Sequence, residues 1–114
     1  MVDRHYATFH IAGFTYWDGV DVFDDLKIGK ELFLEAEPNN SFDQYAVKIL
    51  YKGTMLGYIP KGENVEISKF LQLGYTNLFS VKVSRVNPES NSERQIFVTI
   101  KINKKVENTY NSIQ

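Results

Sequence analysis

The sequence lacks cysteine, long hydrophobic runs and an excess of charge of either sign. Without cysteine the chain cannot form a disulfide, a thiolate zinc site, an iron–sulfur cluster or a cysteine nucleophile. Wholly apolar runs reach only about three residues, which is too short for a membrane span or for the hydrophobic stretch of a signal peptide. These absences predict a cytoplasmic protein.

The net charge is −1, with 13 basic and 14 acidic side chains. Domains that coat nucleic acid by bulk electrostatics usually carry a basic excess, so this mode of binding is disfavoured. The charge is nevertheless uneven, because residues 18–37 hold seven acids against two lysines. The simplest interpretation of that segment is a solvated acidic face.

Strand-forming residues dominate the sequence, which has 114 residues, sixteen of them aromatic. Alternating or compact apolar patterns predict six strands, over residues 5–14, 31–37, 46–51, 54–59, 78–86 and 96–102. In the second, Glu31, Glu35 and Glu37 are expected to face water. The predicted fold is all-β with one short helix, a small OB-like antiparallel β-barrel that forms a single domain over residues 1–103.

The connections between these strands carry recognisable signals. Lys52-Gly53 predicts a tight hairpin turn. The spacing of apolar residues between Asn64 and Leu73 predicts a helix with Asn64 as its N-cap, ended by Gly74. Residues 19–30 fit either a short helical turn or a strand. Residues 104–114 are polar and without periodicity, which predicts a disordered tail.

Catalytic motifs are missing from the sequence. It contains neither a phosphate-binding loop nor a Rossmann glycine fingerprint. Its two histidines, His5 and His10, are expected to face opposite sides of one strand and so cannot share a metal. The adjacent Asp24 and Asp25 are better explained as surface residues than as catalytic acids. We therefore expect no enzymatic activity, no metal and no cofactor.

Three segments combine aromatic and polar residues in a way that a hydrophobic core does not require. They are Gly13-Phe14-Thr15-Tyr16-Trp17, Glu37-Pro38-Asn39-Asn40-Ser41-Phe42-Asp43-Gln44-Tyr45-Ala46-Val47-Lys48 and Gly57-Tyr58-Ile59-Pro60-Lys61. In this order they resemble the HIRAN domain, a family found in some DNA-repair helicase-like ATPases and as free-standing bacterial proteins. The resemblance covers residues 7–101 and implies an OB-like barrel that holds the 3′ end of single-stranded DNA.

The resemblance also implies roles for individual residues. Tyr16 and Phe42 match aromatics that stack on the terminal bases. Asp43 matches an acid that accepts a hydrogen bond from the 3′-hydroxyl and would repel a phosphate there. Lys61 matches a basic residue beside the backbone phosphates.

Other positions of the resemblance are less decisive. Asn39 and Asn40 match loop residues that shape the site or touch the terminal nucleotide. For Trp17, packing under the site and contact with a base are equally compatible with the resemblance. Thr15 stands where DNA-binding relatives have an arginine, and Tyr58 where they have a histidine, so one phosphate contact is lost and DNA affinity should be weaker.

Several alternatives remain open at this point. Asp43 could instead cap its own loop by accepting hydrogen bonds from the amides of Tyr45 or Ala46. The chain could be a protein or peptide interaction module that pairs an exposed strand, residues 96–102, with an extended peptide. It could also be a metal-dependent phosphodiester hydrolase using Asp24, Asp25 and Asp43. The expected partners are single-stranded DNA and a helicase, nuclease or ATPase that acts in DNA repair.

Overall fold

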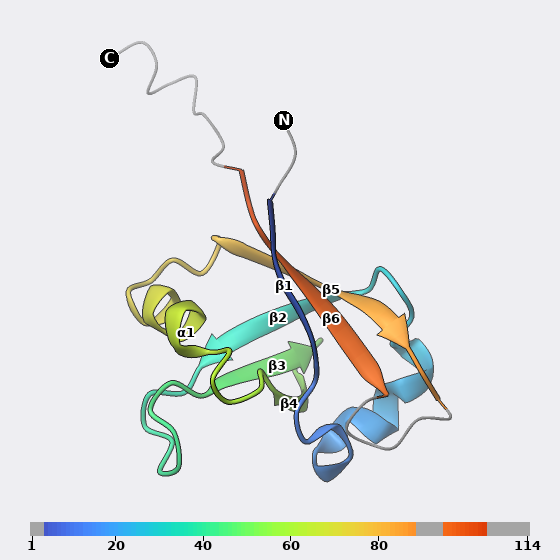
Figure 1. The fold of residues 1–114 in the computed structure, drawn as a ribbon. Helices are drawn as coiled ribbons and strands as arrows, with labels where there is room; N and C mark the ends of the chain where they lie inside the picture. Colours follow the sequence, from blue (N-terminus) through green and yellow to red (C-terminus); the bar gives the residue numbers. More distant parts are fainter. Residues whose placement is uncertain (1–3, 89–94, 105–114) are drawn as a thin grey trace.

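A computed structural model describes residues 4–88 and 95–104 and consists mainly of antiparallel strands (Figure 1). The predicted tail at residues 104–114 lies outside the described residues except for Lys104. The elements are, in chain order, β1 (Arg4–His10), the 3-10 helices η1 (Phe14–Tyr16) and η2 (Asp18–Asp25), β2 (Glu31–Ala36), β3 (Val47–Tyr51), β4 (Thr54–Tyr58), α1 (Val65–Gln72), β5 (Phe79–Val86) and β6 (Ile96–Ile102).

The six strands form one sheet in the order β1-β6-β5-β2-β3-β4, and all the pairs are antiparallel. The sheet curls until the chain just after edge strand β1 meets edge strand β4 at one bridge, where Ala12 and Tyr58 exchange two backbone hydrogen bonds of 2.8 and 2.9 Å. The predicted all-β, OB-like architecture is confirmed, with a barrel that closes through this one bridge rather than through a long strand pair.

Gly57 explains why the two edges can approach so closely. A Cβ atom at this position would collide with the carbonyl oxygen of Ala12 and lie 2.6 Å from Cγ2 of Ile11. Only glycine leaves room for the backbone there. Gly57, the first residue of the Gly57–Lys61 segment, is therefore required for closure of the barrel.

The peptide-pairing alternative requires residues 96–102 to form an exposed edge, and that prediction is wrong. β6 lies between β1 and β5 and pairs with both over its length. Its backbone hydrogen-bonding groups are already used on both sides, so they cannot pair with an added peptide.

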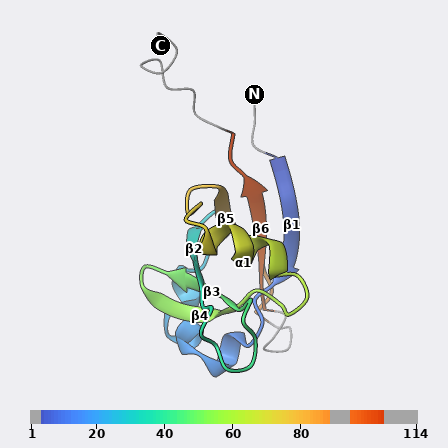
Figure 2. The same ribbon diagram turned by 90° about the vertical axis from the view of Figure 1, so that its left-hand side faces the viewer.

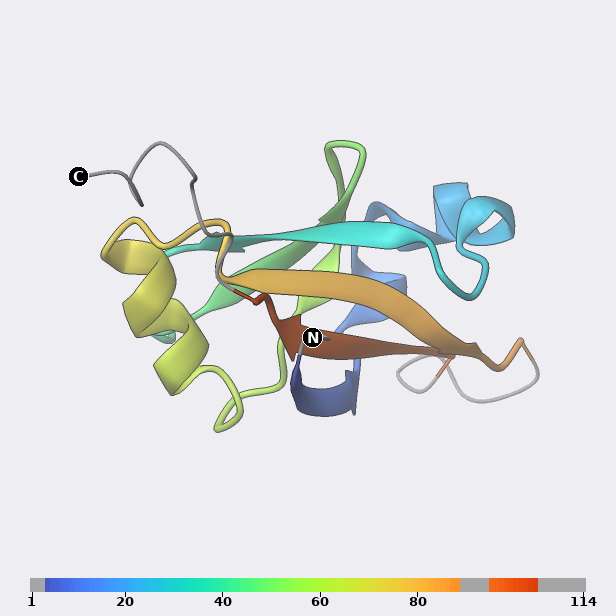
Figure 3. The same ribbon diagram turned by 90° about the horizontal axis from the view of Figure 1, so that it is seen from above.

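The core fills the inside of the curled sheet. Alternate residues of β3, β5 and β6 point inward and are almost completely buried, and they are joined by Ile11, Phe14, Leu26, Leu56 and Ile59 from the connections and from β4. Helix α1 adds Ile67 and Leu71. Seen from above, α1 and the 3-10 helices lie at opposite ends of the sheet (Figure 3), and in the side view α1 lies in front of the sheet (Figure 2).

The connections agree with their sequence signals. The turn between β3 and β4 has positive φ at both central residues, 46° at Lys52 and 83° at Gly53, as hairpin turns of the primed types require. Of the two alternatives for residues 19–30, the helical one is correct for Asp18–Asp25. Gly74, with φ of 95°, follows the end of α1 as predicted.

Candidate functional site

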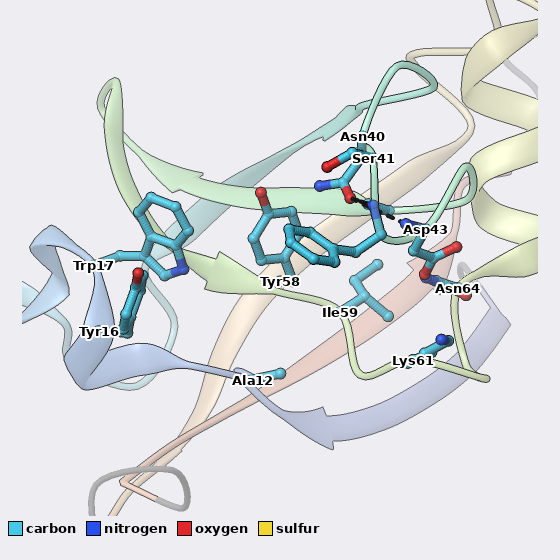
Figure 4. Close-up of a pocket in the computed structure, with 12 residues that line it drawn as sticks. Ala12, Tyr16, Trp17, Asn40, Ser41, Asp43, Tyr58, Ile59, Lys61 and Asn64 are labelled. Atoms are coloured by element: carbon cyan, nitrogen blue, oxygen red, sulfur yellow. Dashed lines mark hydrogen bonds between the residues drawn. The ribbon is translucent and has the colours of Figure 1, made fainter.

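A pocket of about 640 Å³ lies where η1, the loop after β2 and the end of β4 come together (Figure 4). Seven of the nine residues predicted for the site line it: Tyr16, Trp17, Asn40, Phe42, Asp43, Tyr58 and Lys61. The remaining lining residues are Ala12, Ser41, Ala46, Ile59 and Asn64. Three segments far apart in sequence thus form one concave surface.

One wall of the pocket is aromatic and belongs to η1 and β4. Gly13, in the left-handed conformation with φ of 73°, begins η1 and accepts a hydrogen bond from the Tyr16 amide. The Trp17 ring lies edge-on between those of Tyr16 and Tyr58, with centroid distances of 5.1 and 5.9 Å. Tyr16 remains 80% exposed and Trp17 37%, so both rings can meet a ligand.

Packing holds this wall in place. Phe14, between Gly13 and the exposed rings, is completely buried in the core. Gly19 lies so close to the Phe14 ring that a Cβ atom there would be 2.8 Å from Cδ1. The exposed aromatics are therefore attached to a rigid apolar anchor.

The opposite wall is the loop at residues 37–45, and Glu37 organises its base. One carboxylate oxygen of Glu37 accepts hydrogen bonds from Asn40 Nδ2 at 2.6 Å and from the Tyr58 hydroxyl at 2.8 Å. The other oxygen lies 3.4 Å from the Lys48 ammonium. The prediction that Glu37 simply faces water is wrong, because Asn40 and Tyr58 fold back over it and leave it half-buried.

Asn40 also positions the tip of the loop through hydrogen bonds. Its side-chain oxygen accepts hydrogen bonds from the backbone amides of Phe42 at 2.8 Å and Asp43 at 3.0 Å, which is an Asx-type turn. Phe42 is presented by this turn with 91% of its surface exposed. Because the apolar Phe42 ring is exposed and not packed in the core, it is a candidate binding surface.

Asp43 is held by two neighbours at the inner end of the loop. Its Oδ1 accepts a hydrogen bond from the Tyr45 amide and its Oδ2 one from Asn64 Nδ2, both at 2.8 Å. The loop-capping interpretation is thus correct as far as Tyr45 is concerned. Each carboxylate oxygen has a second lone pair, so capping leaves acceptor capacity toward the pocket.

Hydrogen bonding also fixes the charges of the two acids. The hydrogen bond from Asn64, then that from the Tyr45 amide, lowers the pKa of Asp43, with a smaller contribution from the charge of Lys61. The hydrogen bonds from Asn40 and Tyr58 lower the pKa of Glu37. Burial and the bond to Glu37 raise the pKa of Tyr58 to about 12. At neutral pH the pocket therefore presents an ionised carboxylate and a neutral phenol.

The other two predicted residues are Asn39 and Thr15. Asn39 is exposed in the turn at Pro38 and does not line the pocket. Thr15 lies in η1, and its side chain is outside the described part of the structure. Within residues 4–88 and 95–104, no three His, Asp or Glu side chains form a group that could hold a metal, so Asp24, Asp25 and Asp43 do not make the metal centre of a hydrolase.

Two residues important to the geometry are not assigned to the site by sequence reasoning. The sequence predicts only a cap of α1 for Asn64, but its side chain makes no cap and donates to Asp43 instead. Glu37 has the pattern of a solvent-facing strand residue. The signal available for Glu37 is its place at the start of the Glu-Pro-x-Asn segment, whereas no local pattern indicates where Asn64 points.

The architecture and the exposed aromatic pocket define a small β-barrel binding module. A scan against protein-family models matches the HIRAN domain over residues 5–107, so the chain belongs to the HIRAN family, which is known for nucleic-acid binding. HIRAN domains are binding modules rather than catalytic domains. No curated protein matches the sequence.

Two solved structures share the fold. A protein from Lactobacillus plantarum has a TM-score of 0.66 and 19% identity, covering 87% of this chain and 96% of its own. The HIRAN domain of human HLTF has a TM-score of 0.64 and 17% identity, covering 91% of this chain and 82% of its own. In the described part of the chain, no helix is long and apolar enough to cross a membrane.

Proposed function

We propose that the pocket binds the 3′-hydroxyl end of single-stranded DNA. The observation that carries this proposal is the combination of outward aromatic rings, Tyr16 and Phe42, with an ionised carboxylate, Asp43, in one pocket. Rings of this kind stack on any base, which supplies affinity without sequence preference. They are also free to do so, because both are largely exposed on opposite walls.

Asp43 is proposed to recognise the end itself. A carboxylate with a spare lone pair accepts a hydrogen bond from a terminal 3′-hydroxyl, whereas a 3′-phosphate brings a negative charge to the same place. An internal nucleotide has no hydroxyl there to donate. Hydrogen bonds from Tyr45 and Asn64 orient the carboxylate and keep it ionised.

Lys61 and Asn40 complete the proposed site. Lys61 lies exposed at the pocket rim, where its charge suits a backbone phosphate next to the terminal nucleotide. Asn40 uses its side chain to shape the loop, and this favours a positioning role over direct contact with DNA. Trp17 lies between two rings with one side exposed, so its fluorescence can report on ligand binding.

The test compares two oligonucleotides that differ only at their 3′ ends. A short single strand with a free 3′-hydroxyl should bind more tightly than the same strand with a 3′-phosphate, measured by Trp17 fluorescence and by calorimetry. Asp43→Ala should abolish this difference. Equal affinities of the natural chain for the two strands would refute end recognition.

A matched variant separates charge recognition from general electrostatics. Lys61→Gln should weaken binding of both strands by the same factor and leave the ratio of their affinities unchanged. The reason is that both strands have the backbone phosphate that Lys61 is proposed to contact. Asp43→Asn keeps the size and an acceptor oxygen but removes the charge, so it should bind the 3′-phosphate strand better than the natural chain does.

A binding module of this kind requires other proteins to act on the DNA that it holds. We propose that its partner is a helicase, nuclease or ATPase of DNA repair, and that both work in the cytoplasm. Co-purification of the full chain with such an enzyme, and loss of that enzyme's preference for 3′ ends when Asp43 is replaced, tests this association.

A further inference from the structure

A second hollow, of about 350 Å³, lies on the outer face of β5 and β6 and shares no lining residue with the aromatic pocket. Its lining includes two lysines and three hydroxyl side chains, Lys82, Lys101, Ser80, Ser84 and Thr99. Among the described residues that line it, none carries a carboxylate. Gly29 and Ile28, from the connection before β2, form its rim.

A β-bulge in β5 brings Ser84 into this hollow. Val83 pairs with Val98 and Arg85 pairs with Phe97, so Ser84 is the extra residue without a partner on β6. Bulges re-aim side chains and are common next to functional sites. The Ser84 hydroxyl is buried and makes no hydrogen bond to any described residue, which is an uncommon state for a polar atom.

Neither Lys82 nor Lys101 forms an ion pair within residues 4–88 and 95–104. The Cα partner of Lys82 on β2 is Glu31, but Glu31 makes no ion pair with Lys82 and does not line the hollow. Lys82, Lys101 and Ser84 therefore line one concavity and carry hydrogen-bond donors that no described residue accepts.

We propose that this hollow is a phosphate-binding site, distinct from the proposed DNA-end site. Lysine ammonium groups and hydroxyls are donors that phosphate oxygens accept, and paired lysines match the charge of such a group. The phosphate can come from the backbone of a nucleic acid or from a free phosphate compound. Lys82 and Lys101 supply the charge, and the hydroxyl side chains of the lining supply further donors.

Amide chemical shifts of the full chain test the proposal. The labelled protein is titrated, in a phosphate-free buffer at constant ionic strength, with inorganic phosphate, with pyrophosphate and with a single-stranded oligonucleotide. Amides of β5 near Ser84 and of β6 near Thr99 should shift. A response to the oligonucleotide identifies a backbone phosphate as the ligand, and a response only to the two small probes identifies a free phosphate compound.

Variants decide whether the hollow itself is responsible. The double variant Lys82→Gln, Lys101→Gln should remove these shifts with every probe, whereas Lys52→Gln, which removes a lysine from the hairpin turn, should leave them intact. If DNA is the ligand, the double variant should also flatten the salt dependence of its affinity by about 0.7 per lost contact, without changing the ratio between 3′-hydroxyl and 3′-phosphate strands.

Two outcomes would overturn the proposal. One is the absence of shifts in β5 and β6 with all three probes. The other is shifts that persist unchanged in the double variant. Because inorganic phosphate and pyrophosphate contain no DNA end, these outcomes do not depend on whether the aromatic pocket binds DNA, and failure of either proposal is seen separately.

Discussion

The two walls of the aromatic pocket are held by different forces. The η1 wall, with Tyr16 and Trp17, is anchored by the buried ring of Phe14. The loop wall, with Phe42 and Asp43, depends on hydrogen bonds that start at Glu37 and Asn64. Apolar packing is insensitive to pH, whereas a network around two carboxylates is not. The η1 wall should therefore be most sensitive to substitutions that change side-chain volume. The loop wall should be most sensitive to substitutions or pH changes that alter charge.

The largest expected effect comes from disturbing the packed wall. Gly19→Ala places a methyl group within 2.9 Å of Phe14 Cζ and closer still to its neighbouring ring atoms, and this ring is completely buried in the core. Overpacking of this kind should lower the free energy of unfolding by about 3 kcal/mol, measured by chemical denaturation.

Gly62→Ala is the matched control for that prediction. Gly62 has φ of 95°, but a Cβ atom at this position would meet nothing within 4 Å. Only backbone strain of about 1 kcal/mol is therefore expected. Equal losses for the two variants would mean that packing against Phe14 does not hold the η1 wall.

Removing the exposed ring of the loop wall should affect binding and leave stability unchanged. Phe42→Ala should cost about 2 kcal/mol of DNA affinity, about thirty-fold, because one base loses its stacking partner. Tyr16→Ala, on the packed wall, should cost a similar amount. The measurement is calorimetric titration with a single-stranded oligonucleotide.

Phe33→Ala serves as the control for these two variants. Phe33 is 54% exposed on β2 and lies outside the aromatic pocket, so its removal should leave affinity within experimental error. An unchanged affinity of Phe42→Ala would show that bases do not stack on the loop wall.

The third prediction concerns the base of the hydrogen-bond network. Glu37→Gln removes the charge that Asn40, Tyr58 and Lys48 share and should cost about 1.5 kcal/mol of stability. Glu35→Gln is the control, because Glu35 is 60% exposed and 3.7 Å from Lys48, where an ion pair contributes less than about 0.5 kcal/mol. Thermal unfolding of both variants gives the comparison, and equal shifts would contradict the central role of Glu37.

The difference between apolar packing and long-range hydrogen bonds also explains which features could be predicted from the sequence. Strands, core and hairpin follow local periodicity and turn chemistry, which is why β3, β4, β5 and β6 agree closely with expectation. The strand predicted for residues 5–14 ends early, at His10, because Gly13 adopts a left-handed conformation and starts η1.

Long-range polar contacts lie beyond such patterns. Asn64 has the residue type and place of an N-cap, yet Asp43, 21 residues earlier in sequence, takes its side-chain donor. Glu37 alternates like a solvent-facing strand residue, but Tyr58 bonds to it from another strand. The three segments of the motif resemblance come together at one pocket, because motifs record contacts between segments, which periodicity does not.

The smallest expected effect is the response of the loop wall to acid. Glu37 and Asp43 both have a lowered pKa in the folded state, so the unfolded chain binds more protons than the folded one near the ordinary carboxyl pKa of about 4. Their contribution to stability is complete above that pH and is lost as the pH falls through the lowered values. It is small because solvent reaches both carboxylates and screens their interactions.

Amide shifts of Phe42, Asp43 and Tyr45, followed as the pH is lowered from 6 to about 2.5, should change together with a midpoint below about pH 4. The Tyr16 amide, which bonds to Gly13 on the packed wall, should not follow them. Preference for a 3′-hydroxyl thymidine oligonucleotide should disappear with the same midpoint, because protonation removes the charge that Asp43 is proposed to use against a phosphate. A common midpoint for both walls would mean that the pocket unfolds as one unit.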